Sequence, residues 1–186
     1  MAIISNKKNK TKSFFAITAI LGSLTIPQNH SYSKTYLTIN QAKNIMFDNK
    51  SMKKIDVIIS KEQIKNIYKA SNTRVRSNKM NVWRVSDGGW FIVDNVIGKH
   101  ENIDFAISLD KNGKIRDIEI LVYRETYGGE IMNPKWLAQF FGTGNEKKLK
   151  LDDDIKNISG ATLSCRNLTD GVNRITESWN QVLRYL

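Results

Sequence analysis

Cysteine, histidine and proline are all rare in this sequence. Its 186 residues include one cysteine, Cys165, two histidines and two prolines. A single cysteine excludes an intramolecular disulfide, and we expect Cys165 to be a small buried core residue. The usual zinc, haem and iron–sulfur sites need more cysteine and histidine ligands than the chain has. No Gly-x-Gly-x-x-Gly follows a predicted strand, so a nicotinamide dinucleotide site is not indicated either.

The sequence also lacks an apolar run of comfortable membrane-spanning length. Four lysines between residues 7 and 12 precede a short apolar segment, residues 14–26, which ends at Pro27. Ser31 and Ser33 follow at the two positions that a signal peptidase inspects, a pattern typical of a cleaved secretory signal. No cysteine of a lipoprotein follows the apolar segment. We therefore predict a signal peptide over residues 1–33 and a periplasmic or otherwise extracytoplasmic protein, with an uncleaved anchor as the alternative.

Acidic residues are too few to balance the basic ones. The formal net charge is +11, and the four lysines before residue 34 leave +7 for the rest of the chain. An exported protein seldom meets nucleic acid, so we expect no nucleic-acid partner. A solvated face, or attraction to anionic lipid or to an acidic redox partner, suits this charge better. The basic side chains gather at Lys53, Lys54, Lys61, Lys65, Lys69, Arg74, Arg76 and Lys79.

The first part of the mature chain predicts two short helices around a strand. Thr38 and Gln41 have the spacing of a capping box, which opens a helix through about residue 47. Residues 55–59 predict a strand. Ser60 begins a second capping box, and its helix is expected to turn Ile64, Ile67 and Tyr68 inward.

Two hairpins follow. Residues 80–85 and 90–96 flank an Asp-Gly-Gly turn, and residues 105–109 and 115–122 flank a loop that ends at Gly113. In the last of these strands, alternation predicts that Ile118, Ile120 and Val122 share one buried face.

The remaining elements are helical. Asn133 and Pro134 open a helix that Gly142 ends, and the inward side chains are expected to be Trp136, Leu137, Phe140 and Phe141. After residue 162 the apolar residues follow helical spacing on one face: Leu168, Val172, Ile175, Trp179, Val182 and Leu186. The fold class is therefore α+β: one domain with a twisted antiparallel sheet of about five strands, packed by helices and closed by a long C-terminal amphipathic helix.

A Ser-Gly-Ala-Thr string stands where this last helix begins. The first turn of a helix has unpaired N–H groups and the positive end of the helix dipole, so it is a natural seat for a phosphate. Gly160 and Ala161 leave room against the backbone, and the Thr162 hydroxyl is placed to contact a phosphate or to be esterified by one. The alternative is that Ser159 or Thr162 serves as a plain N-cap.

Residues 158–164, Ile-Ser-Gly-Ala-Thr-Leu-Ser, resemble the flavinylation motif of the FMN-binding domain family. Members of that family include flavin subunits of the Na+-translocating NADH:quinone reductase and of Rnf complexes. Residues 123–130 resemble the loop that lies against the flavin in the family, and residues 133–140 resemble the tryptophan-containing helix after it. The resemblance assigns residues 90–186 to an FMN-binding domain, with residues 34–89 as the N-terminal part of the mature chain.

The resemblance implies FMN, joined through its phosphate to Thr162 by a dedicated flavin transferase. Lys156 departs from the family, because many members have an acidic residue at this position, three before the motif serine; the nearest acid here is Asp154. Tyr127 or Trp136 is expected to stack on the flavin, and Arg124 to pair with the phosphate or with Glu125. The implied cofactor-binding residues are Glu125, Thr126, Tyr127, Gly128, Gly129, Trp136, Ser159, Gly160, Ala161, Thr162, Leu163 and Ser164.

No nucleophile–base pair and no paired carboxylates are recognisable in the sequence, and residues 152–154 indicate a solvated acidic turn. An electron-transfer flavoprotein is therefore favoured over a stand-alone enzyme. Its implied partner is a membrane-bound electron-transfer protein that contains quinone or haem. Two alternatives stay open: a flavin-dependent reductase of a small extracytoplasmic acceptor, and a non-redox binding module.

Overall fold

The computed structural model describes residues 34–186, which fold around one antiparallel sheet. The predicted signal peptide, residues 1–33, lies outside them. The strand order is β1-β6-β5-β4-β3-β2, and the two-residue strand β1 (Lys34–Thr35) pairs with the end of β6. The prediction of an α+β fold with about five main strands is confirmed. These strands are β2 (Met52–Ile58), β3 (Lys79–Val85), β4 (Trp90–Ile97), β5 (Asn102–Leu109) and β6 (Ile115–Tyr123).

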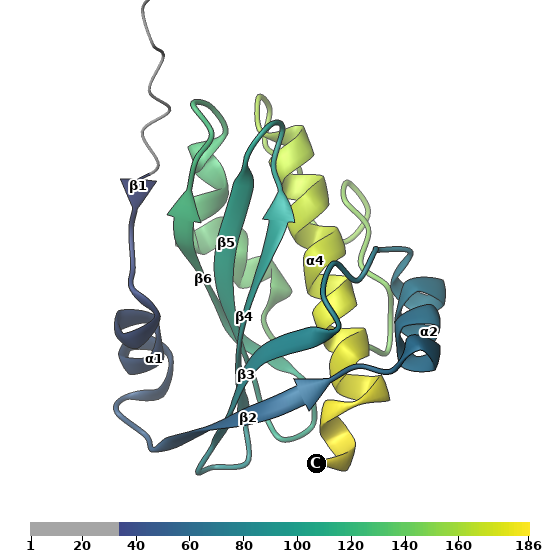
Figure 1. Cartoon of the computed structure of the whole chain (residues 1–186). Helices are drawn as coiled ribbons and strands as arrows, with labels where there is room; N and C mark the ends of the chain where they lie inside the picture. The colour runs from purple at the N-terminus through teal and green to yellow at the C-terminus, as the bar shows by residue number, and fades with distance from the viewer. Residues whose placement is uncertain (1–33) are drawn as a thin grey trace, which may run out of the picture. The chain divides into compact units, whose positions relative to one another are not determined.

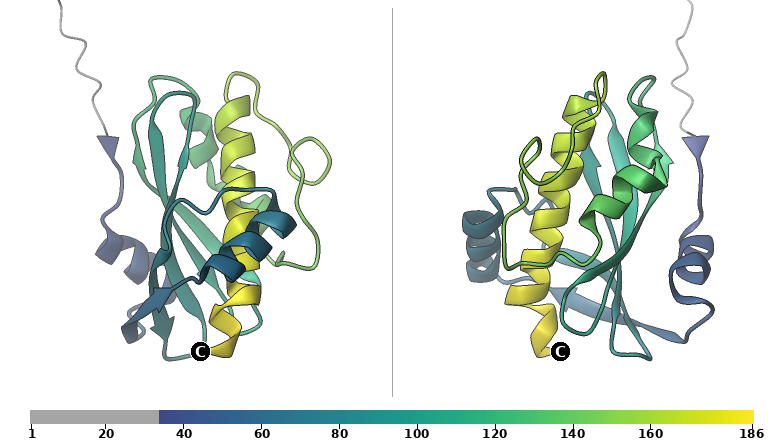
Figure 2. Two further views of the ribbon diagram at one scale, coloured as in Figure 1. Left: turned by 45° about the vertical axis from the view of Figure 1, so that its right-hand side comes forward. Right: turned by 180° about the vertical axis from the view of Figure 1, so that it is seen from behind.

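Helices cover both faces of the sheet (Figures 1 and 2). The long helix α4 (Thr162–Gln181) runs along one face together with α2 (Lys61–Ser71) and α3 (Pro134–Leu137), whereas α1 (Ile39–Phe47) lies on the other. The short 3-10 helices are η1 (Gly129–Met132), η2 (Ala138–Phe140) and η3 (Leu183–Tyr185). Within residues 34–186, no helix combines the length and the apolar character that crossing a membrane requires.

Both predicted capping boxes are present. The Thr38 hydroxyl accepts from the Gln41 N–H at 3.2 Å, and the Gln41 amide oxygen accepts from the Thr38 N–H at 2.8 Å. Ser60 and Gln63 make the same pair of bonds at 3.2 and 2.9 Å. Each box satisfies N–H groups that the first helical turn would otherwise leave unpaired, which fixes where α1 and α2 begin.

Each face of the sheet has its own apolar core. Side chains of β3–β6 pack against α4 in the larger one, where Phe105 and Ile107 are fully buried. The smaller core lies under α1 and is made of Ala42, Phe47, Trp83, Val85, Phe91, Ala106 and Leu121. The predicted apolar face of the last helix is confirmed for Leu168, Val172, Ile175, Trp179 and Val182, all of which are buried.

A β-bulge near the end of β6 overturns the predicted alternation. Asp104 pairs with Val122 but Phe105 pairs with Ile120, so Leu121 is an extra residue in β6. The bulge reverses the faces that follow it. Val122 therefore packs against the smaller core, and Tyr123 enters the larger core in its place.

Three other side chains predicted to be inward are exposed: Tyr68, Phe141 and Leu186. Helix α2 buries a narrow stripe, in which Ile67 is fully covered and Ile64 half-buried, and Tyr68 falls beside it. The helix after Asn133 tightens to 3-10 geometry at Ala138, so Phe141 follows it in extended backbone. Helix α4 ends at Gln181, and the η3 turn buries Leu183 in place of Leu186.

Strands β3 and β4 pair over only part of their lengths, from Asn81 with Val93 to Arg84 with Trp90. Beyond Val93 the two strands separate, and Arg174 from α4 spans the opening. Its guanidinium forms an ion pair with Asp94 at 2.7 Å and donates to the carbonyls of Asn95 and Arg74 at 3.0 and 3.1 Å.

Candidate functional site

The fold brings the two motif segments to one cavity. It has a volume of about 1040 Å³ and lies where β6 ends and α4 begins. That volume is at the upper end of the range for small-molecule and cofactor sites, about 300–1,000 Å³. The lining comes from the β4–β5 turn, the segment after β6 and the start of α4: Lys99, His100, Glu125, Thr126, Tyr127, Gly128, Gly129, Glu130, Gly160, Ala161, Thr162, Leu163 and Ser164.

Tyr123 connects the two motif segments beneath the cavity. Its hydroxyl donates to the Tyr127 carbonyl at 2.5 Å and lies 3.5 Å from Ser164 Oγ on α4. Burial raises the pKa of the Tyr123 hydroxyl, so it stays protonated and remains a donor. The bulge in β6 is what turns this side chain to the α4 side of the sheet.

Gly128 is the point of closest backbone approach. Its φ of +85° lies in the left-handed region, and a Cβ here would stand 2.8 Å from the Tyr123 hydroxyl and 3.4 Å from Ala161 Cβ. A side chain would therefore push the 125–129 segment away from α4. Gly160, also at φ +85°, has nothing within 4 Å of the same position, so its surroundings are open.

The start of α4 has no side-chain cap. Its N-cap residue is Ala161, and the first intrahelical bond runs from the Cys165 N–H to the Ala161 carbonyl at 2.9 Å. The alternative that Ser159 or Thr162 is a plain N-cap is therefore wrong. Within residues 34–186, the Thr162 hydroxyl makes no hydrogen bond, and the N–H groups of residues 162–164 precede the first helical bond. Together with the dipole of a 20-residue helix, they suit an anion.

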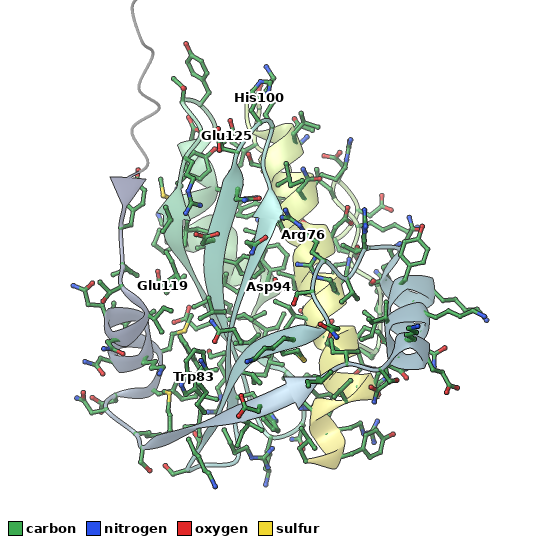
Figure 3. The ribbon with its side chains drawn as sticks, viewed as in Figure 1. Arg76, Trp83, Asp94, His100, Glu119 and Glu125 are labelled. Atoms are coloured by element: carbon green, nitrogen blue, oxygen red, sulfur yellow. The ribbon has the colours of Figure 1, made fainter. Side chains whose placement is uncertain are left out.

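Glu125 turns its carboxylate toward the β4–β5 turn. It accepts hydrogen bonds from the backbone N–H groups of His100 at 2.5 Å and Glu101 at 2.9 Å. Burial acts to raise the pKa of Glu125, but these donors outweigh it and hold the pKa below its ordinary value. Figure 3 shows Glu125 and His100 together at the end of the sheet. The Glu125 carboxylate thus accepts hydrogen bonds from the backbone of the β4–β5 turn.

Two residues named by the resemblance are not in the cavity lining, Ser159 and Trp136. Trp136 is buried, stacks edge-on with Phe140 and donates its Nε1–H to the Lys156 carbonyl at 2.6 Å. The Lys156 N–H donates in turn to the Gln139 side chain at 2.8 Å. Trp136 therefore supports the cavity from below by holding the chain that leads into residues 159–162.

The structure also shows the surroundings of Arg124, Cys165 and Asp154. Arg124 forms an ion pair with Asp104 at 2.8 Å, and its expected pairing with the phosphate or with Glu125 stays a prediction. Cys165 is fully buried in the larger core, as expected, and burial raises the pKa of its thiol. Asp154 forms an ion pair with Lys147 and accepts from the Lys150 N–H at 2.9 Å, in a turn whose other acidic residues are exposed.

A second cavity, of about 530 Å³, lies beside the opening between β3 and β4. The two carboxylates in its lining are already paired, Asp94 with Arg174 and Asp104 with Arg124. It contains none of the motif residues. The cavity at the start of α4 is therefore the stronger candidate for a cofactor site.

Lys99, His100 and Glu130 line the cavity but were not singled out from the sequence. The order of the predicted strands could have placed Lys99 and His100 at the site. In an antiparallel run of three strands, the turn after the first strand lies at the same end as the exit of the third. The predicted strands before and after residues 98–101 therefore placed that turn beside the end of β6.

The comparison with protein families agrees with this choice of site. Residues 98–177 match the family model of the FMN-binding domain, and this stretch contains both motif segments. No curated protein matches the chain. Among solved structures, it is similar to NqrC of Shewanella oneidensis, with 17% identity, a TM-score of 0.48, and coverage of 77% of this chain and 83% of that chain. Residues 98–177 are thus similar to the FMN-binding domain, which confirms the resemblance expected from the two motif segments.

Proposed function

We propose that this protein is an exported electron-transfer flavoprotein whose FMN is joined by a phosphoester to Thr162. The phosphate would sit at the start of α4 and the flavin ring against residues 127–129. The observation that carries the proposal is the single cavity shared by residues 125–129 and 160–164.

The start of α4 has the donors that a phosphate needs. The N–H groups of residues 162–164 lie ahead of the first helical bond, and no side chain caps them. A hydrogen bond from backbone N–H to an anionic oxygen is stronger than one between neutral groups. Thr162 Oγ1 has no other partner in the described part of the chain and stands in the cavity lining. In the bond proposed, Thr162 Oγ1 attacks the phosphorus of an activated flavin phosphate that a flavin transferase supplies. The Oγ1–P bond forms, the bond from phosphorus to the activating group breaks, and that group leaves with the hydroxyl proton. The chain thereby gains the mass of FMN minus one water.

The opposite side of the cavity suits a planar ring. Backbone rather than side chain is presented at Gly128 and Gly129, which permits close approach and leaves N–H groups for ring carbonyls. Tyr127 is 84% exposed and lines the cavity, so its ring is free to stack on the flavin. Bound FMN supplies one- or two-electron chemistry, while these residues bind it, orient it and exclude water from one face.

An electron carrier suits the lining better than an enzyme with its own organic substrate. The Glu125 carboxylate is committed to backbone donors, and the Tyr123 hydroxyl to the Tyr127 carbonyl. Neither group is paired as a nucleophile with a base. We infer that the physiological partner is a membrane-bound electron-transfer protein containing quinone or haem, and that the sequence pattern of residues 1–33 directs export.

The test is the intact mass of the mature protein after co-expression with a flavin transferase. We expect a gain equal to FMN minus one water in the wild type and in Thr162→Ser, which keeps a hydroxyl, but not in Thr162→Val. Thr143→Val is the matched control, because Thr143 lies outside the cavity lining, and it should keep the gain. Flavin that is bound but released on denaturation would support FMN binding and overturn the phosphoester. Colourless wild-type protein would overturn the proposed function.

A further inference from the structure

We propose that Lys99 and His100 are cationic residues that raise the reduction potential of the bound flavin, and that Glu125 positions them. This inference rests on the proposed function. Both residues line the cavity from the β4–β5 turn, which the sequence motifs do not include.

The turn is held rigidly over the cavity. The Gly98 N–H donates to the Glu101 carbonyl at 2.7 Å, and the Glu125 carboxylate accepts from the N–H groups of His100 at 2.5 Å and Glu101 at 2.9 Å. A Cβ on Gly98 would stand 2.6 Å from Glu125 Oε1, so only glycine allows the carboxylate to come this close. The turn geometry is therefore set before any cofactor binds.

In residues 34–186, the Lys99 and His100 side chains have no hydrogen-bond or ion-pair partner, although the Glu125 carboxylate lies within electrostatic range of His100. Both are exposed at the cavity rim.

The acidic groups that face the turn are Glu101 on the turn itself, Glu125 after β6 and Glu130 on η1. Among these three, only the Glu125 carboxylate accepts hydrogen bonds from the backbone N–H groups of the turn, and these bonds offset its charge. Glu125 thus brings two cations to the cavity while its own charge is directed at the turn backbone.

Reduction adds electrons to the flavin and increases its negative charge until protons are taken up. A nearby cation therefore binds the reduced cofactor more tightly than the oxidised one and raises the potential. Lysine stays charged across the physiological range, whereas histidine ordinarily changes its charge between about pH 5 and 8. The contribution of a lysine at position 99 should therefore persist from pH 5.5 to pH 8.

The experiment is a spectroelectrochemical titration of flavin-loaded protein at pH 5.5 and pH 8. For Lys99→Gln we expect about a tenfold loss in the preference for reduced over oxidised flavin at both pH values, which lowers the potential by about 30 mV for a two-electron couple. His100→Gln should lower the potential at pH 5.5, the acid end of the range in which a histidine ordinarily gains charge. Lys111→Gln is the matched control, because Lys111 is also exposed but lies in the β5–β6 turn at the opposite end of the sheet.

The results distinguish failure of this inference from failure of the proposed function. If the variants carry FMN and their potentials match the wild type at both pH values, the inference is overturned and the proposed function stands. If Lys111→Gln shifts the potential as much as Lys99→Gln, the effect is one of net charge and the inference is again overturned. If the wild-type protein takes up no FMN, both are overturned.

Discussion

Gly128 lies against Ala161, and this contact joins the segment after β6 to the start of α4. A Cβ on Gly128 would be 3.4 Å from Ala161 Cβ and 2.8 Å from the Tyr123 hydroxyl. The two halves of the candidate site, distant in sequence, therefore touch through small residues. The cavity owes its shape to this junction.

Gly128→Ala should destabilise the protein more than Gly160→Ala and should lower its flavin content. Both glycines have φ +85°, so the strain of a left-handed alanine, about 1–2 kcal/mol, is common to the two variants. Only the Gly128 variant also meets Tyr123 and Ala161. Urea unfolding measures the difference and absorbance at the flavin band measures the loading. Equal stability losses in the two variants would show that the junction is not tightly packed.

Trp136→Phe should destabilise the protein more than Trp90→Phe, because, within residues 34–186, only the first substitution removes a hydrogen bond. Trp136 Nε1 donates to the Lys156 carbonyl at 2.6 Å, whereas Trp90 Nε1 is buried without a partner in the described part of the chain. Both substitutions lose packing, but the first leaves a backbone carbonyl unpaired, which adds about 1 kcal/mol. It should also loosen residues 157–161 and reduce flavin incorporation. Flavin incorporation that falls as much in Trp90→Phe as in Trp136→Phe would contradict this role.

Arg174→Met should destabilise the fold by about 3 kcal/mol and leave flavin binding intact. The Arg174 side chain is 6% exposed, and its loss leaves Asp94 and two backbone carbonyls without their donor. The exposed Arg184, replaced in the same way, should cost less than about 0.5 kcal/mol. Thermal unfolding with flavin absorbance separates the effects. Loss of flavin in a folded Arg174 variant would mean that the opening between β3 and β4 is coupled to the cavity.

Glu125 should make stability depend on pH in the acid range. Its pKa is lower in the folded protein than the ordinary value of 4.5, so its stabilising contribution is fully present above that value and is lost as pH falls through the folded pKa. The free energy of unfolding should therefore differ between the wild type and Glu125→Gln at pH 7, and the difference should shrink below pH 4.5. A difference that is constant from pH 7 to pH 3.5 would exclude this ionisation as the cause.

Local chemistry made much of this fold predictable. The spacing from Thr38 to Gln41 and from Ser60 to Gln63 specifies capping bonds between near neighbours, and both form. The left-handed Gly113, at φ +80°, stands in the β5–β6 turn where the loop sequence required it. Such signals involve only a few residues, so they do not depend on how distant segments pack.

The errors arose where distant segments decide the outcome. The bulge at Leu121 is a property of the β5–β6 pairing, and no pattern within β6 announces that Tyr123 replaces Val122 on the α4 face. Tyr127 or Trp136 was expected to stack on the flavin, and the indole N–H of Trp136 instead donates to the Lys156 carbonyl, twenty residues later in the chain. Lys99 and His100 come to the site through strand order rather than through a motif.

The most direct test of the central claim is to locate the flavin on the chain. Trypsin cuts after Lys156 and Arg166, so one peptide, residues 157–166, carries Ser159, Thr162 and Ser164. Fragmentation of this peptide from protein co-expressed with a flavin transferase should place FMN minus one water on Thr162. FMN on Ser159 or Ser164, or an unmodified peptide from yellow protein, would contradict the assignment of Thr162 as the attachment site.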